Sequence, residues 1–420
     1  MIIGDGPTAG TGFGEELRQI AFRLVQHGHE VVWLALNYFG YPIDLHDFLF
    51  PDLPHKNSKI TLLGNWGNLQ NFGADIFPRH YKDVVPDIVL LMGDPYRFDR
   101  YFQLKKQMGF PLLFYCTLDG LPIPEHWRAK LSVPDVLITL TNWAREQYTK
   151  VGIKSVTIHH GINWSWWSTT KENKLKIRER YGIPETTKLV ASWDVNQHRK
   201  RQDALLRCFK ACRPEIKDIK LLLYCDWQCR LGWDIEGKDP FTGEPFGLIK
   251  DYNIPRDSII GPKDLLGEDK AWECPQTPQQ LKEIIQMADY YASCASGEGF
   301  GKTLLEAQSL GMPVIATKYS AMPEVVGDAG ILVPTYRGRA GRFRWHDNIR
   351  RVEGGIVNER LFTEALNRMY SNTEEREKLS LIAREHAQLF DYEKHVIPRW
   401  LSLLDRINPD LLLARDLGVL

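Results

Sequence analysis

Short β-rich runs alternate with amphipathic helical segments along almost the whole chain, and this alternation constrains the fold more than any other feature. Val31–Leu36 and Ile88–Met92 are aliphatic runs of strand length. Ahead of them, Glu15–His27 places apolar residues on one helical face and is followed by Gly28, a residue that commonly ends helices. Such alternation is typical of parallel sheets with crossover helices, so we predict an α/β protein built from doubly wound sheets.

The same alternation starts again after residue 167, which indicates a second domain. The polar stretch Ser168–Lys174 separates the two series, and a new strand is expected at Lys188–Ser192. A chain of 420 residues is long enough for two to three domains of about 150 residues. We expect one Rossmann-like domain over residues 1–167, a second over 168–391, and a helical tail over 392–420 that crosses back to the first.

Composition and charge exclude several classes of protein. The 53 basic and 53 acidic side chains cancel, so no overall field draws the chain to nucleic acid or to an anionic membrane. With 43% hydrophobic and 25% charged residues, the composition is that of a folded globular protein. The longest apolar runs fall far short of the roughly 20 residues that span a bilayer, and the first residues lack the pattern of a signal peptide. We therefore expect a soluble, cytoplasmic protein.

The seven cysteines do not resemble a secreted disulfide framework. Cys208/Cys212 and Cys225/Cys229 share a C-x-x-x-C spacing, which allows a four-thiolate zinc site as one interpretation. The first pair falls within an apolar-periodic helical segment and the second follows an expected strand. Buried, reduced thiols are therefore the favoured interpretation.

The most informative segment is a glycine-rich loop between an expected strand and an expected helix. It reads Ser296-Gly297-Glu298-Gly299-Phe300-Gly301-Lys302-Thr303 and continues to Glu306. Glycines let a ligand approach the backbone closely, and the N-terminus of the following helix favours an anion such as a diphosphate. Because carboxylates repel phosphate, the expected partners of Glu298 and Glu306 are hydroxyl pairs, a ribose diol for one and a sugar for the other. In the alternative interpretation, Glu306 only completes a capping box with Thr303, and the glycines only form a turn.

A longer, ordered series of motifs surrounds this loop. Ala307, Gly311-Met312-Pro313-Val314, Pro323-Glu324-Val325-Val326 and Gly330-Ile331-Leu332-Val333 follow it. Thr11-Gly12-Phe13-Gly14, His159-His160-Gly161-Ile162-Asn163 and Arg199-Lys200-Arg201 precede it. Together these motifs resemble the retaining glycosyltransferases of family 4, which have the GT-B fold of two Rossmann-like domains facing a central cleft. The resemblance is strongest for the subgroup with a Thr-Gly-Phe-Gly loop and an Asp-Gly pair, here Asp119-Gly120.

The resemblance implies a donor site for a nucleotide diphosphate sugar in the domain over residues 168–391, with the domain over residues 1–167 on the acceptor side. Glu306 would bind the donor ribose, Glu298 the hydroxyls of the transferred sugar, and Lys200 the diphosphate, with backbone amides of the glycine-rich loop and of Gly12 close to the phosphates. Glu298, Asp119 and Lys200 are the implied catalytic residues. The implied donor-binding residues are Gly12, Arg199, Lys200, Gly299, Phe300, Gly301, Thr303, Leu304 and Glu306.

Three features depart from the family pattern. Family members commonly carry an arginine several residues before the lysine, whereas here Trp193-Asp194-Val195-Asn196 occupies that place, so Arg199 or Arg201 would have to substitute. Many members have histidine at the position of Asp119. The first strand is also unusually short.

The chemistry of the leaving group predicts how the site works. Cleavage of a nucleotide-sugar bond puts new negative charge on the diphosphate, which enzymes stabilise with a carboxylate-bound metal or with fixed cations and helix dipoles. The sequence contains no Asp-x-Asp motif, so we expect the second solution, supplied by Lys200, Arg199 and the helix after Gly301, with no metal and no cofactor. Taken alone, such a short basic run is most often a solvated helix start. In the mechanism that the resemblance implies, no protein nucleophile is required, because the leaving diphosphate helps to deprotonate the acceptor.

The glycines near the N-terminus do not predict a dinucleotide site. Gly10, Gly12 and Gly14 form G-x-G-x-G rather than G-x-G-x-x-G, and the second expected strand ends without the acidic residue that would bind a ribose. This loop is either a place of phosphate approach or a plain turn.

Two clusters are candidates for contact with an acceptor. The span 337–351 contains Arg337, Arg339, Arg342, Arg344, Arg350 and Arg351 with Trp345, opposed only by Asp347. This local cationic surface is otherwise interpreted as a solvated insertion or a subunit contact. Trp164, Trp166 and Trp167 could stack on a sugar or a base, or pack between domains.

The expected function is transfer of a sugar, of hexosyl type, from a nucleotide diphosphate sugar to a glycan, small-molecule or nucleic-acid acceptor, without metal and with retention. One alternative is a nucleotide-sugar epimerase of the same architecture, which acts without an acceptor. The other is a non-catalytic protein that binds glycan or nucleic acid through a degenerate donor site. The presence of both Glu298 and Glu306 argues against degeneration but not against epimerisation.

Overall fold

The chain folds into two compact units. The computed structural model describes residues 1–41, 43–45, 60–212, 218–229, 231–239, 241–267, 277–336, 344–347 and 350–407. Unit 1 comprises Met1–Asn163, Asn348–Val352 and Phe390–Leu420, and unit 2 comprises Trp164–Asp347 and Glu353–Leu389. The division therefore falls at 163/164 and 389/390, near the expected boundaries after 167 and 391. In addition, a short segment around Arg350 belongs to unit 1, although we had expected it in the second domain.

A parallel sheet forms the centre of unit 1, with strands in the order β3, β4, β2, β1, β5, β6, β7, β8. All neighbouring pairs are parallel except β3 and β4. The strands are β1 (Ile2–Gly4), β2 (Val31–Ala35), β3 (Ile43–Leu45), β4 (Ile60–Gly64), β5 (Val89–Gly93), β6 (Leu112–Cys116), β7 (Val136–Thr139) and β8 (Val156–Thr157). The aliphatic and aromatic side chains of β5 and β6 are buried, as expected for strands covered on both faces.

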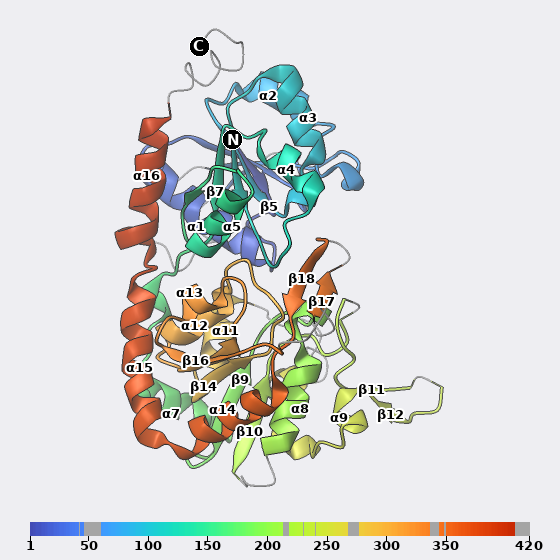
Figure 1. Ribbon diagram of the computed structural model, residues 1–420, viewed down its shortest axis with the longest axis vertical. Helices are drawn as coiled ribbons and strands as arrows, with labels where there is room; N and C mark the ends of the chain where they lie inside the picture. Colours follow the sequence, from blue (N-terminus) through green and yellow to red (C-terminus); the bar gives the residue numbers. More distant parts are fainter. Residues whose placement is uncertain are drawn as a thin grey trace. The chain divides into compact units, whose positions relative to one another are not determined.

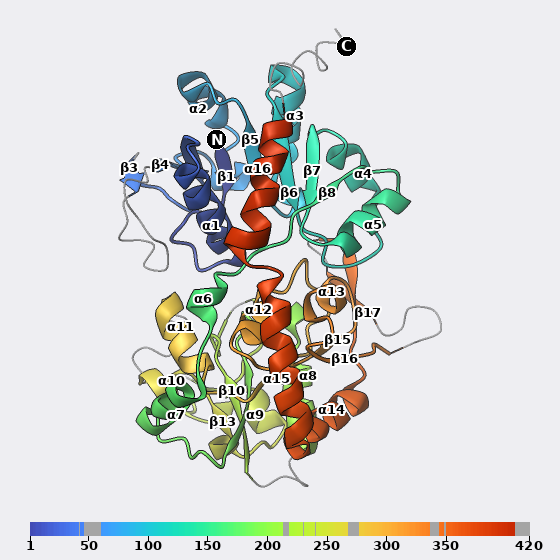
Figure 2. The same cartoon turned by 90° about the vertical axis from the view of Figure 1, so that its left-hand side faces the viewer.

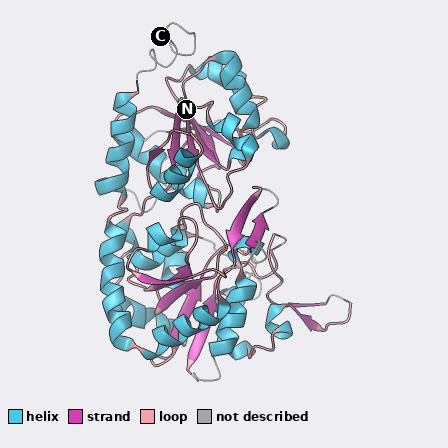
Figure 3. Ribbon diagram, in the orientation of Figure 1, coloured by secondary structure: helices cyan, strands magenta, loops and turns pink. Residues whose placement is uncertain are grey.

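Helices cover both faces of this sheet (Figure 3). They are α1 (Gly12–Gln26), α2 (Phe77–Val84), α3 (Asp99–Met108), α4 (Glu125–Leu131), α5 (Asn142–Lys150) and α16 (Ile397–Arg406), the last preceded by a π-helical turn at Tyr392–Val396. Helix α16 lies beside α1 (Figure 2), and its Trp400 packs edge-on against Tyr115 of β6. The C-terminal segment thus belongs to the same unit as the N-terminal strand.

Unit 2 has its own parallel sheet, with strands in the order β13, β10, β9, β14, β15, β16. The strands are β9 (Lys188–Ser192), β10 (Ile219–Leu223), β13 (Ile259–Ile260), β14 (Tyr290–Ser293), β15 (Val314–Thr317) and β16 (Gly330–Val333). Two short two-stranded ribbons accompany it, β11 (Gly237–Lys238) with β12 (Pro245–Phe246), which are antiparallel, and β17 (Arg344–Asp347) with β18 (Val352–Gly355). The first ribbon projects from the rest of unit 2 (Figure 1).

Ten helices are described in unit 2, and several have the termini that their sequences predict. They are α6 (Trp164–Trp167), α7 (Lys171–Arg180), α8 (Gln202–Cys212), α9 (Leu248–Asp251), α10 (Pro262–Leu266), α11 (Pro278–Ile285), α12 (Lys302–Ser309), α13 (Met322–Val326), α14 (Glu359–Ser371) and α15 (Thr373–Gln388). Thr277 caps α11 by accepting a hydrogen bond from the Gln280 amide at 3.1 Å, a common role of threonine just before a helix.

The cysteines are packing residues in the described part of the chain. Cys208, Cys212 and Cys225 are buried in the core of unit 2 and form no disulfide. Among the described residues, no group of three or more His, Cys, Asp or Glu is arranged to hold a metal ion. The helices of the described residues also include none with the length and apolar character needed to cross a bilayer.

Candidate functional site

The candidate site in unit 2 lies where β9 and β14 end. These two strands are neighbours in the sheet, so the segments after Ser192 and after Ser293 leave the same edge. In doubly wound folds, ligands bind at this carboxyl edge. The backbone joins the two segments, because the Arg199 carbonyl accepts hydrogen bonds from the amide and the hydroxyl of Ser296, at 2.8 and 3.0 Å. The basic run and the glycine-rich loop are therefore fixed to one another.

Lys200 lies between two carboxylates at the centre of this site. Its ammonium is 2.6 Å from Oε1 of Glu298 and 3.1 Å from Oδ1 of Asp194. All three side chains are at least nine-tenths buried. Asp194 also accepts hydrogen bonds from Ser293 at 2.6 Å and from Thr303 at 2.9 Å. A diphosphate that binds Lys200 therefore competes with two carboxylates for the ammonium.

The charged forms of Lys200 and Asp194 stabilise one another. Burial by itself lowers the pKa of Lys200, but the carboxylates of Asp194 and Glu298 outweigh that effect, and the pKa stays above its ordinary value. Burial likewise raises the pKa of Asp194, yet the Lys200 ammonium and the two hydroxyl donors bring it below its usual range. The site therefore holds a permanent cation at neutral pH.

Arg199 and Arg201, the two candidates to replace the missing arginine, occupy different places. The Arg199 guanidinium is 3.3 Å from Oε1 of Glu298 and donates a hydrogen bond to the Gly297 carbonyl. Arg201 instead forms two hydrogen bonds of 2.9 Å to Asp203 at the start of α8. Of the two arginines, Arg199 is the one beside Glu298.

Glu306 is held by an aromatic residue rather than by a helix cap. Its Oε2 accepts a 2.8 Å hydrogen bond from the Trp193 indole, whose ring packs on Tyr291. The capping-box interpretation is wrong, because Gly301 is the N-cap of α12 and the Thr303 hydroxyl donates to Asp194 inside the site. The Glu306 carboxylate is therefore held at the site by a side chain outside its own helix.

The glycine-rich loop delivers the N-terminus of α12 to this site. Gly301 has φ +94°, a left-handed conformation that favours glycine. The first-turn amides and the helix dipole then favour an anion at this end. The Leu304 amide donates to the Gly301 carbonyl at 3.0 Å, and the assignment of Leu304 to the donor site stays a prediction. Phe300 is buried, and so is Gly299, which precedes it in the loop.

Gly12 lies in unit 1, at the first position of α1. A side chain built there would meet open space, so packing within the protein does not require glycine at this position. Gly14 is the glycine that packing requires, since a Cβ there would be 2.7 Å from the Gly6 carbonyl oxygen. Thr11 caps the helix through the Gly14 amide and donates a 2.8 Å hydrogen bond to Asp5, which follows β1.

Asp119 also lies in unit 1, in the loop after β6, and it is paired with an arginine. The Arg350 guanidinium is 3.1 Å from Oδ2 of Asp119 and 3.0 Å from Oδ2 of Asp94, which follows the neighbouring strand β5. Asp94 in turn accepts a 2.7 Å hydrogen bond from Thr117. Asp119 is therefore a member of a carboxylate–arginine cluster rather than an isolated acid.

The arginine-rich span 337–351 and the tryptophans near residue 166 were the two clusters expected to contact an acceptor. Arg337, Arg339 and Arg342 lie outside the described residues, and only the backbone of Arg344 is described, in β17. Arg350 is paired with aspartates, as stated above. In α6, the ring of Trp166 is covered by the Lys282 ammonium at 5.1 Å and meets Trp167 edge-on. These contacts lie within unit 2, whereas the expected alternative to stacking on a ligand was packing between domains, which stays a prediction.

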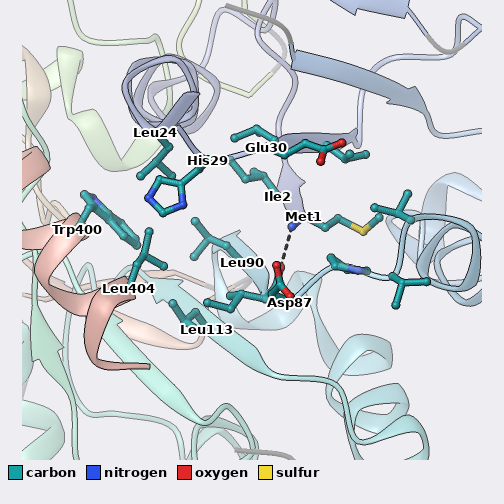
Figure 4. A pocket seen from close by; sticks show the side chains of 16 residues that line it. Met1, Ile2, Leu24, His29, Glu30, Asp87, Leu90, Leu113, Trp400 and Leu404 are labelled. Atoms are coloured by element: carbon teal, nitrogen blue, oxygen red, sulfur yellow. Dashed lines mark hydrogen bonds between the residues drawn. The ribbon is translucent and has the colours of Figure 1, made fainter. Parts of the chain in front are cut away.

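A pocket in unit 1 is lined by none of the candidate site residues (Figure 4). It is located at the amino ends of β1, β2 and β5, the edge of the sheet opposite to Asp94 and Asp119. Its lining includes apolar side chains of Leu24, Leu90, Leu113, Trp400 and Leu404. No residue of the proposed site lines it.

Comparison with known proteins places this geometry in context. Residues 271–341 match the family model described as glycosyl transferases group 1. D-inositol 3-phosphate glycosyltransferase from Saccharomonospora viridis is 34% identical over 122 residues, which are 29% of this chain and 23% of that protein. The chain thus spans about a quarter of the length of that relative. The matched region includes the glycine-rich loop, Glu298 and Glu306.

Solved structures resemble the chain over almost its whole length. Sucrose-phosphate synthase from Thermosynechococcus elongatus superposes with a TM-score of 0.66 at 17% identity, covering 96% of this chain and 98% of the other. HepE from Anabaena, in complex with UDP and glucose, superposes with a TM-score of 0.64 at 15% identity, covering 97% and 99%. The fold is GT-B. The fold class predicted from the sequence is confirmed.

Sequence reasoning missed three residues of the unit 2 site. Trp193 and Asp194 stand where the family pattern has an arginine nearby, so they were noted as a departure and not as members of the site. Tyr291, which donates to Thr303 at 2.9 Å, reads as an ordinary strand residue. The available signal was the buried-strand context, because polar groups directly after two adjacent parallel strands are expected to converge.

Proposed function

We propose that this chain is a glycosyltransferase that moves a sugar from a nucleotide diphosphate sugar to an acceptor hydroxyl, with retention at the anomeric carbon and without a metal ion. The observation that carries the proposal is the convergence of Lys200, Arg199, Glu298 and Glu306 beside the N-terminus of α12. Two cations and a helix N-terminus suit a diphosphate, and two carboxylates suit hydroxyl groups. The match of residues 271–341 to the group 1 family supports it.

The proposed reaction breaks the bond between the anomeric carbon and the diphosphate oxygen, and forms a bond between that carbon and the acceptor oxygen. The acceptor proton passes to the leaving diphosphate, so no protein nucleophile takes part. Lys200, Arg199 and the α12 N-terminus stabilise the charge that develops on the diphosphate. Glu298 holds the sugar, and Glu306 holds the ribose. In unit 1, we propose that Gly12 approaches the donor phosphates and that Asp119 takes part in catalysis.

The nucleotide and the acceptor are open to direct test. The HepE structure holds UDP and glucose, so UDP-glucose is the first donor to test, followed by GDP-mannose and ADP-glucose. We expect one of them to be hydrolysed slowly without an acceptor, releasing nucleoside diphosphate, and the anomeric configuration of the product to match that of the donor by NMR. D-inositol 3-phosphate, which the name of the Saccharomonospora relative contains, is one acceptor to test.

The epimerase alternative predicts a different product. An epimerase without hydrolytic activity converts the nucleotide sugar to its epimer without releasing nucleoside diphosphate and without needing an acceptor. Binding of every nucleotide sugar without turnover would instead favour the non-catalytic alternative. Chromatography of the nucleotide products after incubation with each donor distinguishes the three functions.

A further inference from the structure

The chain passes between the two units at more places than its two large blocks require. Besides 163/164 and 389/390, it enters unit 1 at 347/348 and returns to unit 2 at 352/353. The returning segment, residues 350–355, includes β18 (Figure 1), and we refer to it as the strap. It starts within the arginine-rich span 337–351, to which the proposed function gives no role.

The first residues of the strap are fixed in unit 1. The Arg350 guanidinium donates two hydrogen bonds to Asp94, from Nε at 3.3 Å and from Nη2 at 3.0 Å, and its Nε is 3.1 Å from Oδ2 of Asp119. Val352, two residues later, is 3% exposed and belongs to the apolar core of unit 1. Charged and apolar contacts therefore both hold this end of the strap.

Arg351, between these two anchors, has a strained backbone. Its φ is +57°, a left-handed conformation that is uncommon for residues other than glycine. Such a conformation persists where the surrounding contacts enforce it, and it is often found at functional sites. The anchors at Arg350 and Val352 supply that enforcement, so the course of the strap at this point is set by its contacts.

The last residues of the strap are fixed in unit 2, on the glycine-rich loop of the donor site. The Gly355 amide donates to the Ser296 carbonyl at 2.6 Å, and the Tyr319 hydroxyl donates to the Glu353 carbonyl at 2.7 Å. A Cβ at Gly354 would be 2.7 Å from the carbonyl oxygen and from Oγ of Ser296. A side chain there would therefore push the strap away from the loop. Ser296 is also the residue that binds the backbone of the basic run.

We propose that the strap couples the glycine-rich loop to Asp119, and that Arg350 positions the Asp119 carboxylate for the reaction. The guanidinium group is planar, and Asp94 binds it through two donors, so its place and orientation are defined. Arg350 and Gly355 are only five positions apart, and both are held by the contacts described above. A shift of the loop on donor binding is therefore carried along the strap to Arg350 and Asp119. This inference rests on the proposed glycosyltransferase function, in which Asp119 takes part in catalysis.

Two simpler roles for these contacts make different predictions. A strap that only stabilises the fold would change the free energy of unfolding but not the turnover of folded protein. An arginine that only neutralises two aspartates could be replaced by lysine, which has the same charge but not the planar array of donors. Kinetic measurements on the folded variants separate positioning from both roles.

Arg350→Gln is the first variant to measure, in the full chain and with the donor that the wild-type protein hydrolyses. We expect kcat to fall about 10- to 100-fold, because a misplaced catalytic group costs rate, while affinity for UDP, or for the nucleoside diphosphate that binds, changes less than about twofold. Arg350→Lys should restore only part of the rate. In an Asp119→Asn background, Arg350→Gln should have no further effect on kcat, since it acts through that carboxylate.

Tyr319→Phe and Gly354→Ala release the other end of the strap without a change in unit 1. Tyr319→Phe removes the hydroxyl that bonds to the Glu353 carbonyl, and it carries the test if Arg350→Gln does not fold. Both variants should lower kcat about three- to tenfold, and neither effect should persist in the Asp119→Asn background.

Hydrogen exchange measures the coupling directly. A peptide covering residues 116–121, which contains Asp119, should exchange more slowly when UDP binds the wild type, and this response should be lost in Gly354→Ala although UDP still binds. Arg128→Gln is the matched control, since it removes an exposed arginine of unit 1 that is 3.3 Å from Glu125. It should change no kinetic constant and leave the exchange response intact.

Four results would each overturn the inference: an unchanged kcat in folded Arg350→Gln, wild-type kcat in Arg350→Lys, additive effects of Arg350→Gln and Asp119→Asn, or the same exchange response in Gly354→Ala as in the wild type. In these cases the wild-type protein still hydrolyses its donor, and the proposed function stands. If the wild-type protein hydrolyses no donor and transfers no sugar, the proposed function itself fails, and this inference fails with it.

Discussion

Trp193 donates a 2.8 Å hydrogen bond from its indole nitrogen to Oε2 of Glu306, and this contact fixes the orientation of one carboxylate of the donor site. The two residues are 113 positions apart in the chain. Trp193 directly follows β9, and Glu306 lies in α12, the helix after β14. A carboxylate offers about four lone-pair sites, so the hydrogen bond from Trp193 is compatible with acceptance from a ribose diol. Because Glu306 accepts from Trp193 and not from its own helix, this contact favours a binding role for Glu306 over a capping role.

Glu306→Gln should weaken binding of the donor and of free UDP alike, by about tenfold or more, because hydrogen bonds to a charged acceptor are stronger than neutral ones. Folding should be unaffected, since the glutamine can still accept from Trp193. Calorimetric titration of UDP, or of whichever nucleoside diphosphate binds the wild type, measures the change. Wild-type affinity in this variant would remove Glu306 from the donor site.

Trp193→Phe tests the orienting contact itself. The phenyl ring can still pack on Tyr291, whose ring centroid lies 4.4 Å from that of the indole, but it has no N–H to donate to Glu306. We expect a smaller loss of nucleotide affinity than in Glu306→Gln, about three- to tenfold. The double variant should bind no more weakly than Glu306→Gln alone, because both changes act through one carboxylate. Full additivity in this cycle would show that Trp193 acts independently of Glu306.

Glu298→Gln should behave differently from Glu306→Gln. A residue that contacts the transferred sugar adds nothing to the binding of the sugar-free product, so affinity for the nucleoside diphosphate should be kept or increased. The affinity increases if the lost carboxylate competed with the diphosphate for Lys200, which is 2.6 Å from Glu298. Turnover should fall, by about 100-fold. A variant with normal kcat and weak diphosphate binding would reverse the assignment of the two glutamates.

Asp194→Asn should lower the free energy of unfolding by about 3 kcal/mol, because it removes one partner of a buried ion pair. The pKa of Asp194 is lowered in the folded state from its ordinary value of 3.8. Its contribution to stability is therefore fully present above pH 3.8 and is lost as the pH falls through the lower, folded-state pKa. Urea unfolding of wild type and variant should differ by a constant amount from pH 7 down to about pH 4 and converge below that.

Asp203→Asn is the control for that experiment, since Asp203 forms a buried pair with Arg201 away from the site. It should also destabilise the fold but leave UDP binding unchanged, whereas Asp194→Asn should increase UDP affinity, because Lys200 then loses a carboxylate that competes with the diphosphate. Equal effects of the two variants on UDP binding would mean that Asp194 acts only through stability.

Turnover should survive EDTA if fixed cations stabilise the leaving diphosphate. Donor hydrolysis is measured after dialysis against the chelator, and then with Mn²⁺ or Mg²⁺ added back. We expect less than about a twofold change, since Lys200 and Arg199 supply charge that no chelator removes. Complete loss of turnover that either metal restores would contradict the fixed-cation mechanism.

The sequence predicts the framework of this protein better than the interior of its site. The strands at Lys188–Ser192 and Val314–Thr317 are where their aliphatic runs place them, because buried parallel strands leave a strong local signal. The strand expected at Val156–His159 ends at Thr157, and Ile43–Leu45 was not expected at all. Such short edge strands depend on pairing with a neighbour more than on their own residues.

Within the site, the glutamates could be found from their motif, but their partners could not. Neither Trp193 nor Asp194 has a local pattern that marks it, and each acquires its contact only when β9 lies beside β14. The capping interpretation failed for a local reason: Gly301, in a left-handed conformation, is the N-cap of α12, so the helix begins at Lys302 and Thr303 already lies inside it. Side-chain pairing across strands is a tertiary property, so the chain order of the residues does not reveal it.

The position of Lys200 between Asp194 and Glu298 has a consequence for selectivity against competing ions. Arg199 and Lys200 balance Asp194 and Glu298, so these four side chains together carry no excess positive charge. Inorganic phosphate, an abundant competitor, can break a carboxylate contact but has no ribose for Glu306 and no sugar for Glu298 to hold in exchange. A complete donor replaces each displaced contact with a new one. We therefore expect the site to bind free phosphate only weakly, even at concentrations that would saturate a cluster of cations without neighbouring carboxylates.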